Sequence, residues 1–145
     1  MVFVIRHAEK AAGADPDPSL SVAGQLRAER LATIFGSAQP ELGLQAIIVT
    51  ELRRTQETAR PLANAKGIPV VVVHAAEPAA AVRRALDDYA GQRVLIIGHS
   101  NTVPAIVREL SGERVSDIAE TDYGTLYVVS RPRFSRSSVA VLHLP

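Results

Sequence analysis

Short apolar runs rich in valine and isoleucine recur along the chain, separated by segments with a helical pattern. The runs are continuous rather than alternating. A continuous run predicts a strand buried on both faces, as in a parallel sheet with helices on each side. The predicted strands are Val2–Ile5, Ala46–Val49, Val70–Val73, Val94–Ile97, Leu126–Val129 and a weaker one at Val139–Leu142.

Four helices are predicted between these strands from apolar periodicity and from residues that favour helix ends. In the first, Ser21 is the expected N-cap, apolar residues recur every three or four positions, and Gly36 ends the helix. The other three are Leu52–Lys66, closed by Gly67 and Pro69; Ala79–Tyr89, opened by Pro78 and closed by Gly91; and about Val103–Leu110, ending near Gly112.

Strand and helix thus alternate four times before two further strands. This order predicts an α/β fold with three layers (α/β/α) and a largely parallel central sheet, in which the last strands need not be parallel. The length of 145 residues is that of one domain, so residues 1–145 are expected to form a single unit.

The amino-acid composition argues against several kinds of partner and site. The formal net charge is +1, from 16 Lys and Arg against 15 Asp and Glu, so no general field attracts nucleic acid or an acidic membrane. The absence of cysteine excludes disulfides, thiol catalysis and cysteine-based metal sites. No apolar run approaches the ~18 residues of a membrane span, and the opening residues lack a signal-peptide pattern. We therefore expect a cytoplasmic protein, although a leader removed before Met1 would not be visible.

Reactive side chains follow each of the first four predicted strands. Ligands of open α/β sheets bind outside the carboxyl ends of the parallel strands, so these side chains are expected to meet at one edge. They include two histidines and at least two arginines. The full set is Arg6, His7 and Glu9; Thr50, Glu51, Arg53 and Arg54; His74 and Glu77; and His99, Ser100, Asn101 and Thr102.

Such a set is suited to phosphoryl transfer. Guanidinium groups match phosphate oxygens two at a time, so several arginines around one site indicate a polyanionic group. A neutral imidazole has a lone pair that can attack phosphorus, while arginines stabilise the charge on the transferring group. The turn from Gly98 to Asn101 leads into a helix whose N-terminal amides would add donors for phosphate.

Four short blocks resemble the signatures of the histidine phosphatase superfamily, which contains phosphoglycerate mutases and phosphohistidine phosphatases. Arg6-His7-Ala8-Glu9 resembles its Arg-His-Gly-Glu, and Leu20-Ser21-x-x-Gly24 resembles its Leu-Thr-x-x-Gly. Thr50-x-Leu52-x-Arg54-Thr55-x-x-Thr58-Ala59 is similar to its Ser-x-Leu-x-Arg-Ala-x-x-Thr-Ala block, and Gly98-His99-Ser100 is similar to its Gly-His-Ser. The blocks stand in the family order and span about Val2 to Leu110.

The resemblance implies a role for each matched residue. His7 would be the nucleophile that becomes phosphorylated, Arg6 and Arg54 would bind the phosphoryl group, and His99 would hydrogen-bond one of its oxygens. Ser100 and Asn101 are added as candidates for phosphate binding because they follow His99. The family uses neither a metal nor an organic cofactor, so none is expected here.

The matched blocks do not include a general acid, because this chain departs from the mutase pattern after the third strand. Glu77 is the natural candidate there, with Glu9, Glu120 and Asp122 in reserve. Ala8 replaces the commoner glycine of the family, and Thr50 replaces serine while keeping the hydroxyl.

The leading hypothesis is a metal-independent phosphatase that acts on a phosphorylated small molecule or a phosphoprotein, including phosphohistidine. Short connections leave little room for a lid, and an open site favours hydrolysis because water can reach the phosphoenzyme. The alternatives are a phosphoglycerate mutase-like phosphotransferase and a non-catalytic phosphate-binding module. A metal hydrolase ranks last, since no His pair at i, i+4 and no Asp cluster occurs.

Overall fold

The computed structural model describes residues 1–37 and 43–145. Its elements follow the order β1 (Val2–Arg6), α1 (Val22–Gly36), β2 (Ala46–Thr50), α2 (Arg53–Lys66), β3 (Val70–Val73), α3 (Pro78–Arg83), η1 (Arg84–Asp88), β4 (Val94–Gly98), α4 (Val103–Ser111), β5 (Thr125–Ser130) and β6 (Ser138–His143). All six strands form one sheet in the order β3-β2-β4-β1-β5-β6.

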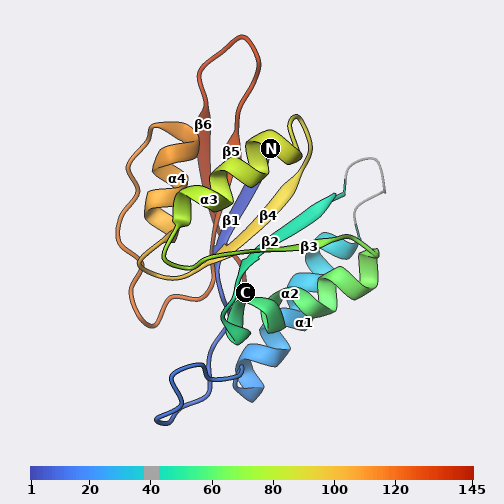
Figure 1. The fold of residues 1–145 in the computed structure, drawn as a ribbon, viewed down its shortest axis with the longest axis vertical. Helices are drawn as coiled ribbons and strands as arrows, with labels where there is room; N and C mark the ends of the chain where they lie inside the picture. Colours follow the sequence, from blue (N-terminus) through green and yellow to red (C-terminus); the bar gives the residue numbers. More distant parts are fainter. Residues whose placement is uncertain (38–42) are drawn as a thin grey trace.

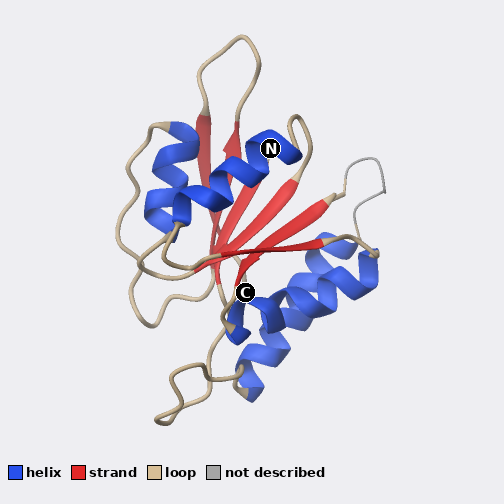
Figure 2. Cartoon of the chain, viewed as in Figure 1, coloured by secondary structure: helices blue, strands red, loops and turns tan. Residues whose placement is uncertain are grey.

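The sheet is parallel from β3 to β1 and antiparallel from β1 to β6. α1 and α2 cover one face, and α3 and α4 cover the other (Figures 1 and 2). The three-layer α/β/α arrangement and the largely parallel sheet are therefore confirmed. The helices lie on both faces because each central strand sends alternate apolar side chains to opposite sides.

The core forms in two halves that follow this alternation. Ile47 and Leu95 belong to the cluster under α1 and α2, whereas Ile48 and Ile96 belong to the cluster under α3 and α4. All four side chains are buried, as the continuous apolar runs predict for the centre of a doubly covered sheet.

Both edge strands depart from the expectation of burial on two faces. Val70 and Val72 of β3 are 40% and 53% exposed, and Val141 and Leu142 of β6 are about half exposed. A run of four valines looks the same in sequence whether its strand lies at the centre or at the edge. The helices cover the middle of the sheet, so one side of each outer strand meets solvent.

The helix ends mostly follow the predicted capping residues. Ser21 accepts a hydrogen bond from the Gly24 N–H at the start of α1, and Gly67 ends α2 in the left-handed conformation at φ 63°. The third predicted helix is not a single α-helix, because it changes to a π-helix, η1, after Arg83. No helix among the described residues is long and apolar enough to cross a membrane.

Candidate active site

Side chains from separate parts of the chain meet at the C-terminal edge of the parallel strands. β4 lies between β1 and β2, and its register places Arg6 beside Gly98. His7, which directly follows β1, donates its backbone N–H to the Gly98 carbonyl at 2.9 Å. The rings of His7 and His99 consequently lie 5.3 Å apart between centroids. Together with Arg54 of α2, these residues form what we call the His7 cluster: Arg6, His7, Arg54 and His99.

Gly98 allows the end of β4 to pack closely against the start of α4. A Cβ atom at this position would lie 3.1 Å from the Thr102 hydroxyl and 3.2 Å from a methyl group of Val103. The Thr102 hydroxyl also accepts the backbone N–H of His99 at 3.0 Å. A side chain at position 98 would therefore disturb the turn that sets the His99 ring in place.

One hydrogen bond fixes the tautomer of His7. Its Nδ1 lies 2.7 Å from the Ala8 carbonyl oxygen, which can only accept, so Nδ1 carries the proton. The lone pair is then on Nε2, and the Nε–H of Arg54 points at it from 3.2 Å. The ring thus presents a neutral, oriented nitrogen lone pair toward a guanidinium group.

The surroundings of His7 also hold the ring neutral. The residue is 3% exposed, and burial is the main reason that its pKa falls to about 3. The hydrogen bond to Ala8 acts in the opposite sense, because it stabilises the charged ring. Charges on His99, Arg54 and Arg6 lower the pKa further. At neutral pH the Nε2 lone pair is therefore free of a proton.

His99 is held from the other side of the cluster. Its Nε2 lies 3.0 Å from the Thr50 hydroxyl, while its Nδ1 has no hydrogen-bond partner among the described residues. Burial, followed by the charge of Arg54, lowers its pKa to about 4, and Glu51 opposes this shift. When Thr50 donates to Nε2, the ring proton lies on Nδ1 and is available to an acceptor.

Arg6 is buried and anchored by a loop that follows α4. Its Nη1 donates to the carbonyl oxygens of Ala119, Glu120 and Asp122 at 3.2, 2.9 and 3.2 Å. The guanidinium also lies 4.1 Å from the ring centre of Tyr123, a cation–π geometry. Its Nε has no partner within the described part of the chain. The loop thus fixes one side of the guanidinium and leaves Nε unused.

Arg54 is oriented by contacts at the start of α2. Its Nη1 lies 3.9 Å from a carboxylate oxygen of Asp17, which also accepts the backbone N–H of Arg53 at 2.9 Å. The Thr58 hydroxyl accepts the Ala8 N–H at 3.0 Å and donates to the Arg54 carbonyl at 2.6 Å. Thr58 therefore ties the end of β1 to the helix that carries Arg54.

The acidic candidates fall into different environments. Glu77 is exposed, precedes α3, and makes no side-chain hydrogen bond or ion pair with any described residue. Glu9 binds the Arg27 guanidinium through both carboxylate oxygens, and Asp122 accepts hydrogen bonds from Gly124 and Thr125. The last two carboxylates are thus engaged in structural contacts.

Two other carboxylates interact with residues of the His7 cluster, Glu120 with Arg6 and Glu51 with His99. Glu120 approaches Arg6 Nη2 at 3.3 Å and accepts a hydrogen bond from Ser100 at 3.3 Å. Glu51 contacts His74 Nδ1 at 3.2 Å and accepts the backbone N–H of Ala75 at 2.8 Å. Burial acts to raise the pKa of Glu51, but the Ala75 hydrogen bond and the charges of His74 and His99 hold it below its usual value.

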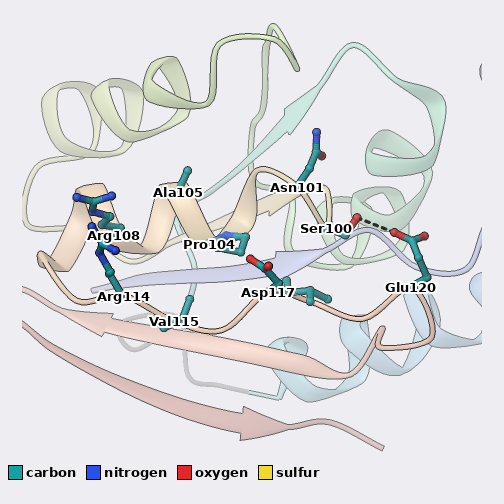
Figure 3. Close-up of a pocket in the computed structure, with 10 residues that line it drawn as sticks. Ser100, Asn101, Pro104, Ala105, Arg108, Arg114, Val115, Asp117 and Glu120 are labelled. Atoms are coloured by element: carbon teal, nitrogen blue, oxygen red, sulfur yellow. Dashed lines mark hydrogen bonds between the residues drawn. The ribbon is translucent and has the colours of Figure 1, made fainter.

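Ser100 and Asn101 differ in their relation to the cluster. The Ser100 hydroxyl reaches it through Glu120 (Figure 3). The Asn101 side chain is exposed and makes no hydrogen bond with the four residues of the His7 cluster. Ser100 thus adjoins the site, whereas Asn101 lies at its margin.

Sequence reasoning did not single out Tyr123 or Asp17 as parts of the site. Tyr123 belongs to a stretch, Glu120–Tyr123, for which a place beside the pocket could not be derived from spacing. It contacts Arg6 across 117 sequence positions, and its ring lies 6.3 Å from that of His7. Asp17 lies in a loop whose path no local pattern specifies. Among the described residues, no group of three or more His, Asp or Glu side chains could hold a metal ion.

Comparisons with solved structures show the fold. The protein histidine phosphatase SixA complexed with tungstate superposes with a TM-score of 0.74 at 18% identity, covering 98% of this chain and 96% of that one. A mycobacterial glucosyl-3-phosphoglycerate phosphatase gives 0.71 at 17% identity, with 99% and 98% covered. A structure proposed to be the phosphohistidine phosphatase SixA of Agrobacterium tumefaciens gives 0.69 at 21% identity, with 97% and 96% covered.

Family membership is shown by comparison of the sequence with family models. A comparison with curated proteins gives no match. The model of the histidine phosphatase superfamily (branch 1) matches residues 2–76, which include His7, Arg6 and Arg54. That match extends over more than half of the chain and agrees with the fold. The chain belongs to the histidine phosphatase superfamily.

Proposed function

We propose that this chain is a metal-independent phosphatase that hydrolyses phosphate monoesters or phosphohistidine through a phosphohistidine intermediate on His7. One observation carries the proposal. The His7 ring is buried, its proton is held on Nδ1 by the Ala8 carbonyl, and its Nε2 lone pair faces Arg54 at 3.2 Å. Phosphate binding alone would not require an oriented and unprotonated nitrogen at the centre of the site.

In the first step, Nε2 attacks phosphorus, an Nε2–P bond forms, and the bond from phosphorus to the leaving oxygen breaks. The electron pair of the broken bond goes to that oxygen, which takes a proton from a general acid. The imidazole becomes positively charged as the new bond forms. The hydrogen bond from Nδ1–H to the Ala8 carbonyl stabilises this charge, which is why that bond opposes the fall in the pKa of His7.

The other members of the His7 cluster would stabilise the transferring group. Arg54 would turn its guanidinium from the lone pair of His7 to the equatorial phosphoryl oxygens, and Arg6 would bind them through Nε. His99 would donate from Nδ1, the nitrogen that has no partner among the described residues. Arg6 is held by Tyr123 and the loop after α4, and His99 is held by Thr50, so these two donors need little reorganisation during the reaction.

In the second step, water attacks the phosphohistidine, an O–P bond forms, and the Nε2–P bond breaks. The proton of the water passes to the base that was the acid of the first step, and phosphate leaves. The connections around the site are short, since a single helix links β2 to β3 and only α3 and η1 lie between β3 and β4. Water can reach the intermediate, so hydrolysis is favoured over the phosphotransfer of a mutase.

Glu77 remains our proposed general acid because it follows β3 at the edge that carries the cluster. A test compares Glu77→Gln on phenyl phosphate, whose leaving group needs protonation, and on p-nitrophenyl phosphate, whose leaving group needs it less. Loss of the acid should slow the first substrate more than the second. Glu120→Gln and Glu51→Gln are the matched variants. If either shows this selectivity and Glu77→Gln does not, the role belongs to that residue.

The function itself is tested by hydrolysis of p-nitrophenyl phosphate in the presence of EDTA. The His7→Ala variant should lose at least about a hundredfold in kcat/KM, whereas His143→Ala, outside the cluster, should retain the native value. Phosphohistidine peptides are assayed in parallel, since a phosphoprotein is as suitable a substrate as a small ester. Activity that survives the His7 change would refute the mechanism. Absence of His7-dependent turnover on every substrate would favour a phosphate-binding module.

A further inference from the structure

A groove beside the His7 cluster has no role in the steps above. It encloses about 600 Å³ and runs along α4, with the segment from residue 114 to 120 as its opposite wall (Figure 3). Its volume is within the range of about 300–1,000 Å³ that small-molecule sites occupy. Ser100 lies at one end of the groove, and the side chains of Arg108 and Arg114 lie together at the other end.

Both walls of the groove are fixed to the body of the protein. On α4, Ile106 and Val107 are buried in the core, and Arg108 is exposed beside the groove. On the opposite segment, Val115 and Ile118 pack against the same core. Both walls are therefore held against the core, while Arg108 and Arg114 are exposed.

The groove adjoins the proposed catalytic centre at its Ser100 end. The Ser100 hydroxyl donates to one oxygen of Glu120 at 3.3 Å, and the other oxygen lies 3.3 Å from Arg6 Nη2. The Glu120 side chain lines the groove and also contacts the guanidinium that would bind the phosphoryl group. This side chain is 82% exposed, so a substrate can displace it without disturbing the core.

The charges at the far end indicate the ligand. The guanidinium groups of Arg108 and Arg114 make no hydrogen bond or ion pair with any described residue. Two unpaired guanidinium groups at one place suit a carboxylate or a phosphate. Arg108 lies five residues along α4 from Val103, a rise of about 7.5 Å from the helix start. A ligand that reaches both ends must therefore be several bonds long.

We propose that this groove holds the leaving group of a small-molecule substrate that carries a second anion, and that Arg108 and Arg114 bind this anion. The proposal rests on the proposed phosphatase function, because the first phosphoryl group must occupy the His7 cluster. Asp117 also lines the groove and opposes the binding of an anion. Removal of the Asp117 charge should therefore strengthen anion binding, whereas removal of the arginines should weaken it.

The test uses two series of alkyl phosphates of increasing length, one ending in a methyl group and one in a carboxylate or a second phosphate. For the length that spans the groove, the native enzyme should prefer the anionic member. The double variant Arg108→Ala/Arg114→Ala should lose about five- to twentyfold in kcat/KM on it, as two exposed ion pairs allow, and should keep its rate on the methyl-ended member. Asp117→Asn should raise the preference about two- to threefold.

Arg136→Ala is the matched control. It removes the same charge from the β5–β6 loop, which lies at the opposite end of the sheet because β5 runs antiparallel to β1. This variant should behave as the native enzyme does with every substrate. An anion preference that is equal in the native enzyme and the double variant would overturn the proposal. So would the absence of a preference at any length.

Binding is measured separately, so that a failure of the phosphatase function can be recognised. Phosphonates with and without a terminal carboxylate cannot be hydrolysed, and calorimetry gives their Kd without turnover. Arginine-dependent selectivity in binding, with no hydrolysis of any substrate, would support the groove and refute the enzyme. The double variant could instead lose affinity for an acidic phosphohistidine peptide and for no small dianion. That result would overturn the assignment of the groove to a small-molecule substrate.

Discussion

The two buried histidines should make the protein less stable in mild acid. Burial lowers the pKa of His7 to about 3 and that of His99 to about 4, whereas an unfolded histidine titrates near 6.5. Between these values the unfolded chain binds protons that the folded chain does not. The stability contributed by the neutral rings is thus fully present above pH 6.5 and is lost as the pH falls toward 4.

The size of the effect follows from the same values. From pH 7 to pH 5, an unfolded histidine becomes almost fully protonated while both folded rings stay neutral, a change of about 2 kcal/mol for each ring. Solvent screening and the interaction between the rings reduce the sum, so we expect the pair to contribute a loss of about 2–4 kcal/mol.

Urea unfolding followed by circular dichroism at pH 5, 6, 7 and 8 measures the effect. His7→Asn and His99→Asn should each flatten the dependence of the unfolding free energy on pH by up to about 2 kcal/mol between pH 7 and pH 5. A buried asparagine also changes the unfolding free energy at every pH. The test therefore compares, for each variant, the change in unfolding free energy between pH 7 and pH 5. His143→Asn is the control. Variants that keep the native slope would refute the burial argument, as would a native protein equally stable at pH 5 and pH 7.

Three further substitutions test contacts around the site. Arg54→Lys should lower kcat/KM for p-nitrophenyl phosphate at least about tenfold, because an ammonium lacks the planar fork that binds two phosphate oxygens at once. Thr58→Val leaves a buried backbone amide without its acceptor and should cost about 1–3 kcal/mol in urea unfolding, whereas Thr58→Ser should cost less. Gly24→Ala would drive a Cβ into the Glu9 carbonyl and should lower the midpoint of thermal unfolding, whereas Gly36→Ala meets no atom within 4 Å and should not.

The parts of the structure that follow from short-range pattern could be predicted from the sequence. The strand after Met1, the N-cap at Ser21 and the left-handed glycine at position 67 each depend on residues within a few positions. The meeting of His7 and His99 could also be expected. Parallel strands place their carboxyl ends at one edge, and both residues directly follow such strands.

Features that depend on how distant parts of the chain are arranged in space could not be predicted from the sequence. The exposure of Val70 and Val72 depends on β3 being the outermost strand, which its sequence does not express. The anchoring of Arg6 depends on residues 113 to 117 positions away along the chain. The contact is made mainly by backbone carbonyl oxygens, and any residue type supplies a carbonyl, so no motif marks it.

The use of carbonyl oxygens to hold Arg6 has a consequence for the mutational tolerance of this loop. Ala119, Glu120 and Asp122 contribute their main chains, so substitution of their side chains leaves these three acceptors in place. The side chain of Glu120 borders the groove, while its carbonyl secures the arginine. If the groove binds the leaving group as proposed, a change of side chain at position 120 would alter which leaving group is accepted. It would remove the carboxylate contact with Arg6 Nη2 but leave the three carbonyl acceptors in place.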